Sequence, residues 1–362
     1  MKRLRPREQL ASDGALILKF WMHLSRDGQK QRLKELEKDP RTRWRVTKRD
    51  WQHFKLYGRF MRCAERAIRE TSTGEAPWTI VDGSDDRYRS LTVGKILLEA
   101  LRRRLDRKGA KRETVSAPPL PPAIDKLDLI RALDLTQGVT RKQYEKQIEK
   151  YQEKLARLVR EPGFRKVGAV AVFEGNDAAG KGGSIRRVTG AMDARNYGIV
   201  PIAAPTEEER AQPYLWRFWR HVPLKGRLLI FDRSWYGRVL VERVEGFASE
   251  SDWMRAYSEI NDFEAQLAEA GYVVAKFWLA ISKQEQLKRF KERERTAFKR
   301  FKITAEDWRN RKKWDDYERA VCEMVDRTSS DIAPWTLVEA NDKYFARLKI
   351  LKTLCARIEK AL

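Results

Sequence analysis

Short apolar runs alternate with longer mixed segments through the C-terminal two thirds of the chain. The first run, residues 167–173, is continuous and rich in valine, which is typical of a strand covered on both faces. Similar runs follow at residues 199–203, 227–231, 272–279 and 335–338. Because helix-length segments separate the runs, the pattern predicts an α/β fold with a parallel sheet of about five strands, flanked by helices and joined by right-handed crossovers.

A helical pattern precedes the first strand. Residues 140–159 are amphipathic, with Thr140 in a capping position and Pro162 and Gly163 beyond the end. We therefore expect a long helix that leads into the first buried strand.

The chain matches itself without a gap when it is shifted so that residue 19 meets residue 276. The aligned pairs include Lys19 and Lys276, Ser25 and Ser282, Thr47 and Thr304, Asp50 and Asp307, and Trp78 and Trp335. Residues 125–263, which precede the second copy, have no counterpart before the first. The match predicts that residues 1–106 are the C-terminal half of a repeated domain; a truncated sequence, a split gene or a natural loss would each produce it.

A basic and proline-rich stretch at residues 107–124 separates the two copies. Its composition is typical of a stiff polar linker. The predicted organisation is therefore a partial repeat (1–106), a linker (107–124) and a complete domain (125–362).

A glycine-rich loop follows the first predicted strand and has the pattern G-x-x-x-x-G-K, with a helix expected over residues 184–192. In this context the pattern indicates a P-loop, whose backbone amides and helix N-terminus bind phosphate while Lys181 adds a cation. Residues 1–106 contain no such loop. The candidate phosphate-binding backbone positions are Gly175, Ala178, Ala179, Gly180, Gly182 and Gly183.

Two carboxylates are candidate metal ligands. Gly182 stands where many P-loop enzymes have the Ser or Thr that binds magnesium, so we expect Asp177, inside the loop, to take that role. Asp232 ends another apolar run and is the second candidate. Arg233 follows it and has the chemistry to stabilise charge on a phosphoryl group in transfer.

Residues 283–302 mix many lysines and arginines with three phenylalanines. Such a run is often a solvated helix face; beside a P-loop it also fits a basic helical lid that closes over phosphates and excludes water. Both interpretations stay open on the sequence alone.

The formal net charge of +24 favours a polyanionic partner: polyphosphate, nucleic acid or an acidic lipid surface. Three cysteines without CxxC spacing and three scattered histidines favour neither a disulfide framework nor a zinc site. No apolar run reaches membrane-spanning length and no secretion signal is evident, so the expected location is the cytoplasm, without a membrane partner.

These motifs together resemble the P-loop polyphosphate kinases of type 2. The resemblance rests on the segments at residues 173–183, 205–209 and 231–236, on His221 and Pro223, and on Ala333-Pro334-Trp335. The doubled arrangement is similar to the two-domain, class II members of this family, which transfer phosphoryl groups between polyphosphate and AMP.

The resemblance implies a role for each candidate residue. Lys181 and Arg233 would contact the transferring phosphoryl group, and Asp177 and Asp232 would bind Mg²⁺, with Mn²⁺ as the alternative, and orient the acceptor. It also assigns two arginines to the lid: Arg289 and Arg293.

The expected reaction is reversible, Mg²⁺-dependent transfer from polyphosphate to AMP, giving ADP. An ATP-dependent nucleoside monophosphate kinase, a polyphosphate:NDP phosphotransferase and, less favoured, a nucleic-acid-binding P-loop protein are the alternatives. Exposed apolar surface on the partial repeat would favour association into a homo-oligomer.

Overall fold

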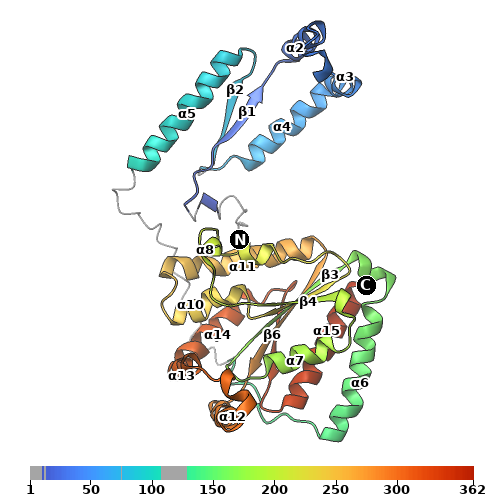
Figure 1. The fold of residues 1–362 in the computed structure, drawn as a ribbon, viewed down its shortest axis with the longest axis vertical. Coiled ribbons are helices and arrows are strands. Elements are labelled where there is room, and N and C mark those ends of the chain that lie inside the picture. Colours follow the sequence, from blue (N-terminus) through green and yellow to red (C-terminus); the bar gives the residue numbers. More distant parts are fainter. Residues whose placement is uncertain (1–9, 12–13, 75, 107–128) are drawn as a thin grey trace. The chain divides into compact units, whose positions relative to one another are not determined.

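The C-terminal part of the chain forms the predicted parallel sheet (Figure 1). In the computed structural model, which describes residues 10–11, 14–74, 76–106 and 129–362, each strand overlaps one of the predicted runs. The strands, in their order across the sheet, are β4 (Tyr197–Pro201), β5 (Leu228–Asp232), β3 (Gly168–Gly175), β6 (Tyr272–Ala280) and β7 (Trp335–Glu339). All four neighbouring pairs are parallel, which confirms the predicted fold class.

Helices cover both faces of the sheet, so β3 is buried from Gly168 to Glu174. Because side chains alternate along a strand, Ala169 and Ala171 join one core and Val170 and Val172 the other. The first core also includes residues of α6 (Arg141–Leu158), α7 (Lys181–Thr189) and α15 (Lys343–Ala361). The second includes residues of η4 (Trp235–Val239), α11 (Glu250–Glu269) and α14 (Trp314–Thr328).

The predicted helix at residues 140–159 is confirmed as α6. The hydroxyl of Thr140 accepts a hydrogen bond from the Gln143 amide, and the Gln143 side chain accepts one from the Thr140 amide, which closes a capping box. The remaining helices of this part are α8 (Glu207–Arg210), α9 (Trp216–Trp219), α10 (Val241–Val244), α12 (Lys283–Arg295) and α13 (Ala305–Lys312). The described residues contain no helix that is both long and apolar enough to cross a membrane.

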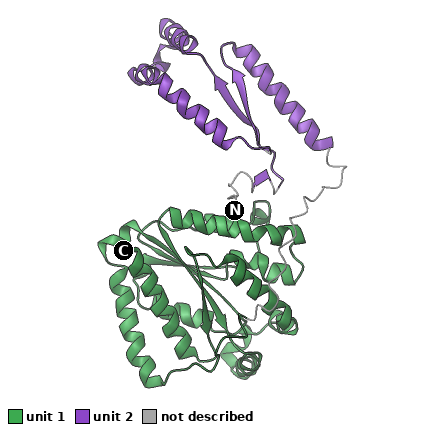
Figure 2. Cartoon of the chain, turned by 180° about the vertical axis from the view of Figure 1, so that it is seen from behind, with its two compact units in different colours: residues 1–4, 115–362 green, residues 5–114 purple. Residues whose placement is uncertain are grey.

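The described residues form two compact units, with those up to 106 in the N-terminal unit and those from 129 onward in the C-terminal unit (Figure 2). Among its described residues, the N-terminal unit has a two-stranded parallel sheet, the short 3-10 helix η1 (Arg43–Arg45) and four longer α-helices. The strands and α-helices are β1 (Lys19–His23), α2 (Arg26–Lys38), α3 (Lys48–Lys55), α4 (Tyr57–Thr71), β2 (Trp78–Asp82) and α5 (Asp86–Asp106). The predicted linker, residues 107–124, lies outside the described residues.

The internal repeat extends to individual hydrogen bonds. In the C-terminal unit the Lys276 ammonium donates to the Thr328 carbonyl at 2.8 Å, and the Trp335 indole donates to the Thr328 hydroxyl at 2.9 Å. In the N-terminal unit Lys19 donates to the Thr71 carbonyl at 2.6 Å, and the Trp78 indole donates to the Thr71 hydroxyl at 2.8 Å. Equivalent sequence positions therefore make the same contacts in both units.

The two units differ at the strand that carries Lys276. In the C-terminal unit β6 lies between β3 and β7, whereas among the described residues β1 pairs with β2 alone. The difference also affects helix packing: Leu354 and Ile358 on α15 are fully buried, but the equivalent Leu97 and Leu101 on α5 each remain 45% exposed. Apolar positions that the larger core covers are thus open in the N-terminal unit.

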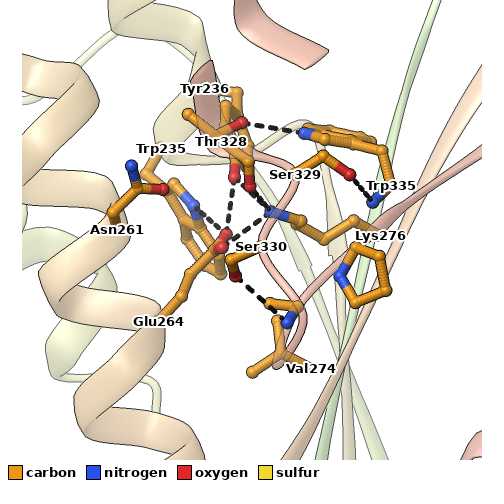
Figure 3. A network of polar contacts seen from close by, with 12 residues as sticks. Trp235, Tyr236, Asn261, Glu264, Val274, Lys276, Thr328, Ser329, Ser330 and Trp335 are labelled. Atoms are coloured by element: carbon orange, nitrogen blue, oxygen red, sulfur yellow. Dashed lines mark hydrogen bonds and ion pairs between the residues drawn. The ribbon is translucent and has the colours of Figure 1, made fainter. Parts of the chain in front are cut away.

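A buried ion pair joins α11 to β6 beneath the second core (Figure 3). The Lys276 ammonium and the Glu264 carboxylate are 2.7 Å apart, and both side chains are almost completely buried. The Tyr236 hydroxyl donates to Glu264 at 2.7 Å, and the Trp235 indole donates to it at 3.1 Å. Burial raises the pKa of Glu264 and lowers that of Lys276, so each charge depends on the other.

Replacement of Lys276 by Met should lower the free energy of unfolding by about 3–5 kcal/mol at neutral pH, because Glu264 keeps its burial and loses its counter-charge. The loss should shrink as the pH falls, since a protonated Glu264 no longer needs a cation. Urea denaturation at several pH values measures both effects. Lys352→Met, at an exposed position of α15, is the matched control, and a pH-independent loss would contradict the prediction.

Candidate active site

The P-loop connects the buried end of β3 to α7 and needs unusual backbone angles. Gly175 and Gly180 have φ angles of 151° and 108°, and Ala178 is also left-handed at 64°. A Cβ on Gly175 would lie 2.5 Å from the Leu279 carbonyl oxygen, so the close approach to β6 requires glycine there. The helix begins at Lys181, three residues before the predicted 184, because Gly180 already acts as its capping residue.

Lys181 lies across the P-loop at the first position of α7. Its ammonium donates to the Gly175 carbonyl at 2.8 Å, which places the cation over the loop that begins at that glycine. Backbone amides at a helix N-terminus carry positive potential, so the lysine and the helix favour an anion at the same place.

Asp177 lies opposite Arg233, as expected for residues at the carboxyl ends of adjacent parallel strands. Its carboxylate is 3.7 Å from the Arg233 guanidinium and accepts a hydrogen bond from the Asn310 amide at 2.9 Å. The Asp177 side chain is 15% exposed, and that of Arg233 is 50% exposed. The structure therefore brings two of the candidate residues into contact and leaves the arginine accessible.

The turn after β5 holds Arg233 in a strained conformation. Arg233 has a φ angle of 65°, a left-handed value that typically costs 1–3 kcal/mol in residues other than glycine. Its amide donates to the Phe173 carbonyl at 3.0 Å, which fastens the turn to the strand that carries the P-loop. Asp232 is the last residue of β5 and lies close enough to Glu174 to raise that residue's pKa.

Glu174 is a site residue that the sequence reasoning missed. It is 6% exposed, and its carboxylate accepts a hydrogen bond from the Ser234 hydroxyl at 2.8 Å. Burial raises its pKa, while the nearby charges of Lys181 and Arg233 oppose the increase. An acidic residue inside an otherwise apolar strand was the signal that could have identified it.

Arg289 differs from the lid arginine that the resemblance implied. Its side chain is 5% exposed and forms a 2.7 Å ion pair with Glu285. The guanidinium donates to two carbonyls of the P-loop, at Ala178 and Ala179, with distances of 3.0 and 3.1 Å. It also donates to the carbonyls of Ala340 and Asn341, both at 2.8 Å. In this structure Arg289 is therefore a buried support of the P-loop, and its role in a lid stays a prediction.

Arg293 lies one helical turn later on α12. It is half-buried, and burial lowers its pKa while Asp307 and Asp177 oppose the decrease. The structure thus separates the two predicted lid arginines: Arg289 supports the P-loop and Arg293 lies within electrostatic reach of Asp177. The basic run itself forms α12 and the 3-10 helix η5 (Ala297–Lys302).

A polar cluster on α13 and α14 continues from Asp177, and the sequence reasoning missed it too. The Tyr317 hydroxyl is 3.3 Å from the Asn310 side-chain oxygen and 3.4 Å from Glu245. Glu245 is 5% exposed and forms ion pairs of 3.1 Å with both Arg309 and Lys313. Burial raises the pKa of Tyr317, so it stays a neutral donor. Basic residues that continue past residue 302 were the available signal.

The model of the family described as polyphosphate kinase 2 (PPK2) matches residues 4–109 and 138–362. The chain belongs to the polyphosphate kinase 2 family. This confirms the family that the P-loop and its neighbouring motifs resembled, and both units of the chain fall within the match.

Relatives cover nearly the whole chain. A protein of Pseudomonas aeruginosa named polyphosphate:AMP phosphotransferase is 59% identical over 352 residues, which is 97% of this chain and 71% of the relative. A protein of Acinetobacter johnsonii with the same name is 39% identical over 97% of this chain and 70% of the relative. A protein of Ruegeria pomeroyi named NDP-polyphosphate phosphotransferase 3 is 37% identical over 66% of this chain and 80% of its own length.

Solved structures agree with the fold. A crystal structure of a polyphosphate kinase 2 from Pseudomonas aeruginosa superimposes with a TM-score of 0.84 at 56% identity, covering 98% of this chain and 70% of that one. The polyphosphate kinase 2 structure from Arthrobacter aurescens gives 0.61 at 33% identity, over 64% of this chain and 85% of the other.

The two candidate carboxylates fit a hard cation that takes most of its ligands from water molecules and from the substrate. The described residues contain no group of three or more His, Cys, Asp or Glu side chains able to hold a metal by themselves. Asp177 and Asp232 offer two carboxylates at neighbouring strand ends. One or two carboxylates with phosphate oxygens are the donor set in which Mg²⁺ is usually found.

Replacement of Glu174 by Gln should make stability less dependent on pH. The native pKa of Glu174 is raised from 4.5. The contribution of Glu174 to the free energy of unfolding is therefore fully present below that value and is lost as the pH rises through the native pKa. A native pKa that lies one pH unit above the unfolded value corresponds to a loss of about 1.4 kcal/mol, and Gln does not ionise. Denaturation from about pH 5 to about pH 8 should show the variant gaining on the wild type as the pH rises.

The control for this series is Glu149→Gln, at an exposed position of α6. Parallel curves for wild type and Glu174→Gln across the pH range would show that the native pKa of Glu174 is not raised.

Proposed function

We propose that the C-terminal unit transfers the terminal phosphoryl group of polyphosphate to AMP, giving ADP, in a reversible reaction. The observation that carries the proposal is the 3.7 Å approach of Arg233 to Asp177 beside a P-loop lysine. This arrangement sets two cations and a metal-directed carboxylate around one phosphate position. The two relatives reported above that match nearly the whole chain are named polyphosphate:AMP phosphotransferase, and the charge of +24 suits a polyanionic donor.

The reaction requires positioning and charge neutralisation and no covalent enzyme intermediate. The P-loop amides bind phosphates of the polyphosphate chain, and Lys181 and Arg233 contact the phosphoryl group in transfer and stabilise its charge. A divalent metal, which we take to be Mg²⁺ with Mn²⁺ as a substitute, would be held by Asp177 and Asp232 and would supply charge neutralisation between the phosphates. Because its substrates include AMP and ADP, we place the reaction in the cytoplasm.

Polyphosphate with AMP and Mg²⁺ should yield ADP, and ATP as the sole phosphoryl donor should not replace polyphosphate. Lys181→Met and Asp177→Asn should each lower kcat about 10²–10³-fold, because each removes charge that the transition state needs. Lys352→Met, remote from the P-loop on α15, is the control, and ADP formation followed by chromatography is the measurement. Transfer from ATP but not from polyphosphate would instead identify a nucleoside monophosphate kinase.

The N-terminal unit is best explained as the C-terminal half of a second domain, so we propose boundaries at residues 1–106, 107–124 and 125–362. It has a structural role in this proposal, because the P-loop sequence occurs in the C-terminal unit alone. The exposed Leu97 and Leu101 occupy positions whose counterparts lie in a core. Association with a second copy of the chain would bury this apolar surface, so we propose that the protein is a homo-oligomer.

Charge introduced into this surface should weaken the association. The double variant Leu97→Glu and Leu101→Glu should shift the sedimentation-velocity profile toward a monomer at concentrations where the wild type is associated. Lys95→Glu, at an exposed polar position of the same helix, should leave the profile unchanged. A wild-type chain that stays monomeric at every concentration would rule out the proposed association.

A further inference from the structure

The outer side of α12 contains a cationic groove of about 650 Å³ that lies between this helix and Arg311 of α13. Five of its nine lining residues are basic, and Glu292 is the acidic one. The basic residues are Lys283, Lys288, Lys291, Arg295 and Arg311. We propose that this groove binds a distal stretch of the polyphosphate chain, beyond the residues that react at the P-loop. The inference deepens the proposed function and rests on it.

The two faces of α12 have different tasks. Gln286, Arg289 and Phe290 are buried. Lys288, Lys291 and Arg295 follow one another at spacings of three and four residues, so they share the opposite, exposed face. The basic run therefore has a solvated row of cations on one side, which is one of the two interpretations of its sequence. On the other side it supports the P-loop, which the sequence did not suggest.

The row of cations is poorly compensated by the protein. Glu285 lies 3.7 Å from Lys288 but 2.7 Å from Arg289, so its stronger pairing is with the buried arginine. Glu292 is paired with Lys299 at 3.3 Å. Like charges at helical spacings of three and four destabilise a helix, and a bound polyanion would remove that cost.

Hydrogen bonds connect the groove wall to the P-loop. The Arg311 guanidinium donates to the Lys283 carbonyl at 2.7 Å and to the Gln286 side-chain oxygen at 3.0 Å. The Gln286 amide in turn donates to the Asp177 carbonyl at 3.2 Å. One side chain, Gln286, thus connects the groove wall to the loop, and in this proposal the groove and the P-loop lie along the path of one polyphosphate chain.

The chemistry of the groove favours polyphosphate over single-stranded nucleic acid. Proteins that bind single strands without sequence preference combine cations with aromatic side chains on which bases stack. The residues that line this groove are charged, polar or aliphatic, and none of them is aromatic. A ligand that consists of phosphates alone can pair with the cations of the groove and needs no aromatic side chain.

The test is the dependence of KM on chain length. In the double variant Lys291→Glu and Arg295→Glu, the ratio of KM for long-chain polyphosphate to KM for a short oligophosphate should increase about tenfold. The slope of log KM against log salt for the long chain should also fall, by about 0.7 for each lost contact. The milder pair Lys288→Gln and Lys291→Gln should change the ratio in the same direction and guards against misfolding of the charge-reversed variant.

The matched control is Lys146→Glu with Lys150→Glu, which makes the same change of charge at the same spacing on α6. An unchanged ratio in both groove variants, or an equal change in the α6 control, would overturn the inference. If the wild type transferred no phosphate from polyphosphate, the proposed function would fail. Equilibrium titration with long-chain polyphosphate would then test the groove separately, and equal binding by wild type and groove variants would overturn it too.

Discussion

The site depends on the support of a strained, glycine-rich loop from both of its sides. On one side the loop continues from β3, which is buried at the centre of the sheet and pairs with β5 and β6. On the other side the Arg289 guanidinium donates to the carbonyls of Ala178 and Ala179. These two contacts tie the carbonyls of the loop to a buried cation and so fix the backbone on which the proposed phosphate site depends.

The C-terminal unit contains two ion pairs with a buried cation, and the exposed cations near the site are not fully compensated. Glu264 is paired with Lys276, and Arg289 is paired with Glu285. Removing either partner would leave a charge without water or a counter-ion, which is why these pairs constrain the fold. The cations on the outer face of α12 differ, because they remain exposed to water and need no protein counter-ion. The fold thus uses charge in two ways: to orient elements internally and to attract a polyanion.

The repeat shows which contacts the two units have in common. Lys19, Thr71 and Trp78 reproduce the hydrogen bonds of Lys276, Thr328 and Trp335, because these contacts are made within the duplicated segment. Burial is not retained in the same way, as the exposure of Leu97 shows. The two units therefore share these local hydrogen bonds, whereas the burial of the equivalent helix positions differs between them.

The sequence by itself determined the strand order in the chain, the P-loop and the family, because period, glycine spacing and the strand-loop-helix context are local properties. It also placed Asp177 and Arg233 at strand ends that a parallel sheet brings together, although their catalytic roles stay predictions. The buried position of Arg289, the raised pKa of Glu174 and the Asn310 contact to Asp177 were decided by tertiary structure alone. Each of these three features depends on which face of one element packs against another element that is distant in the chain. Composition and residue spacing are local properties and do not specify that packing.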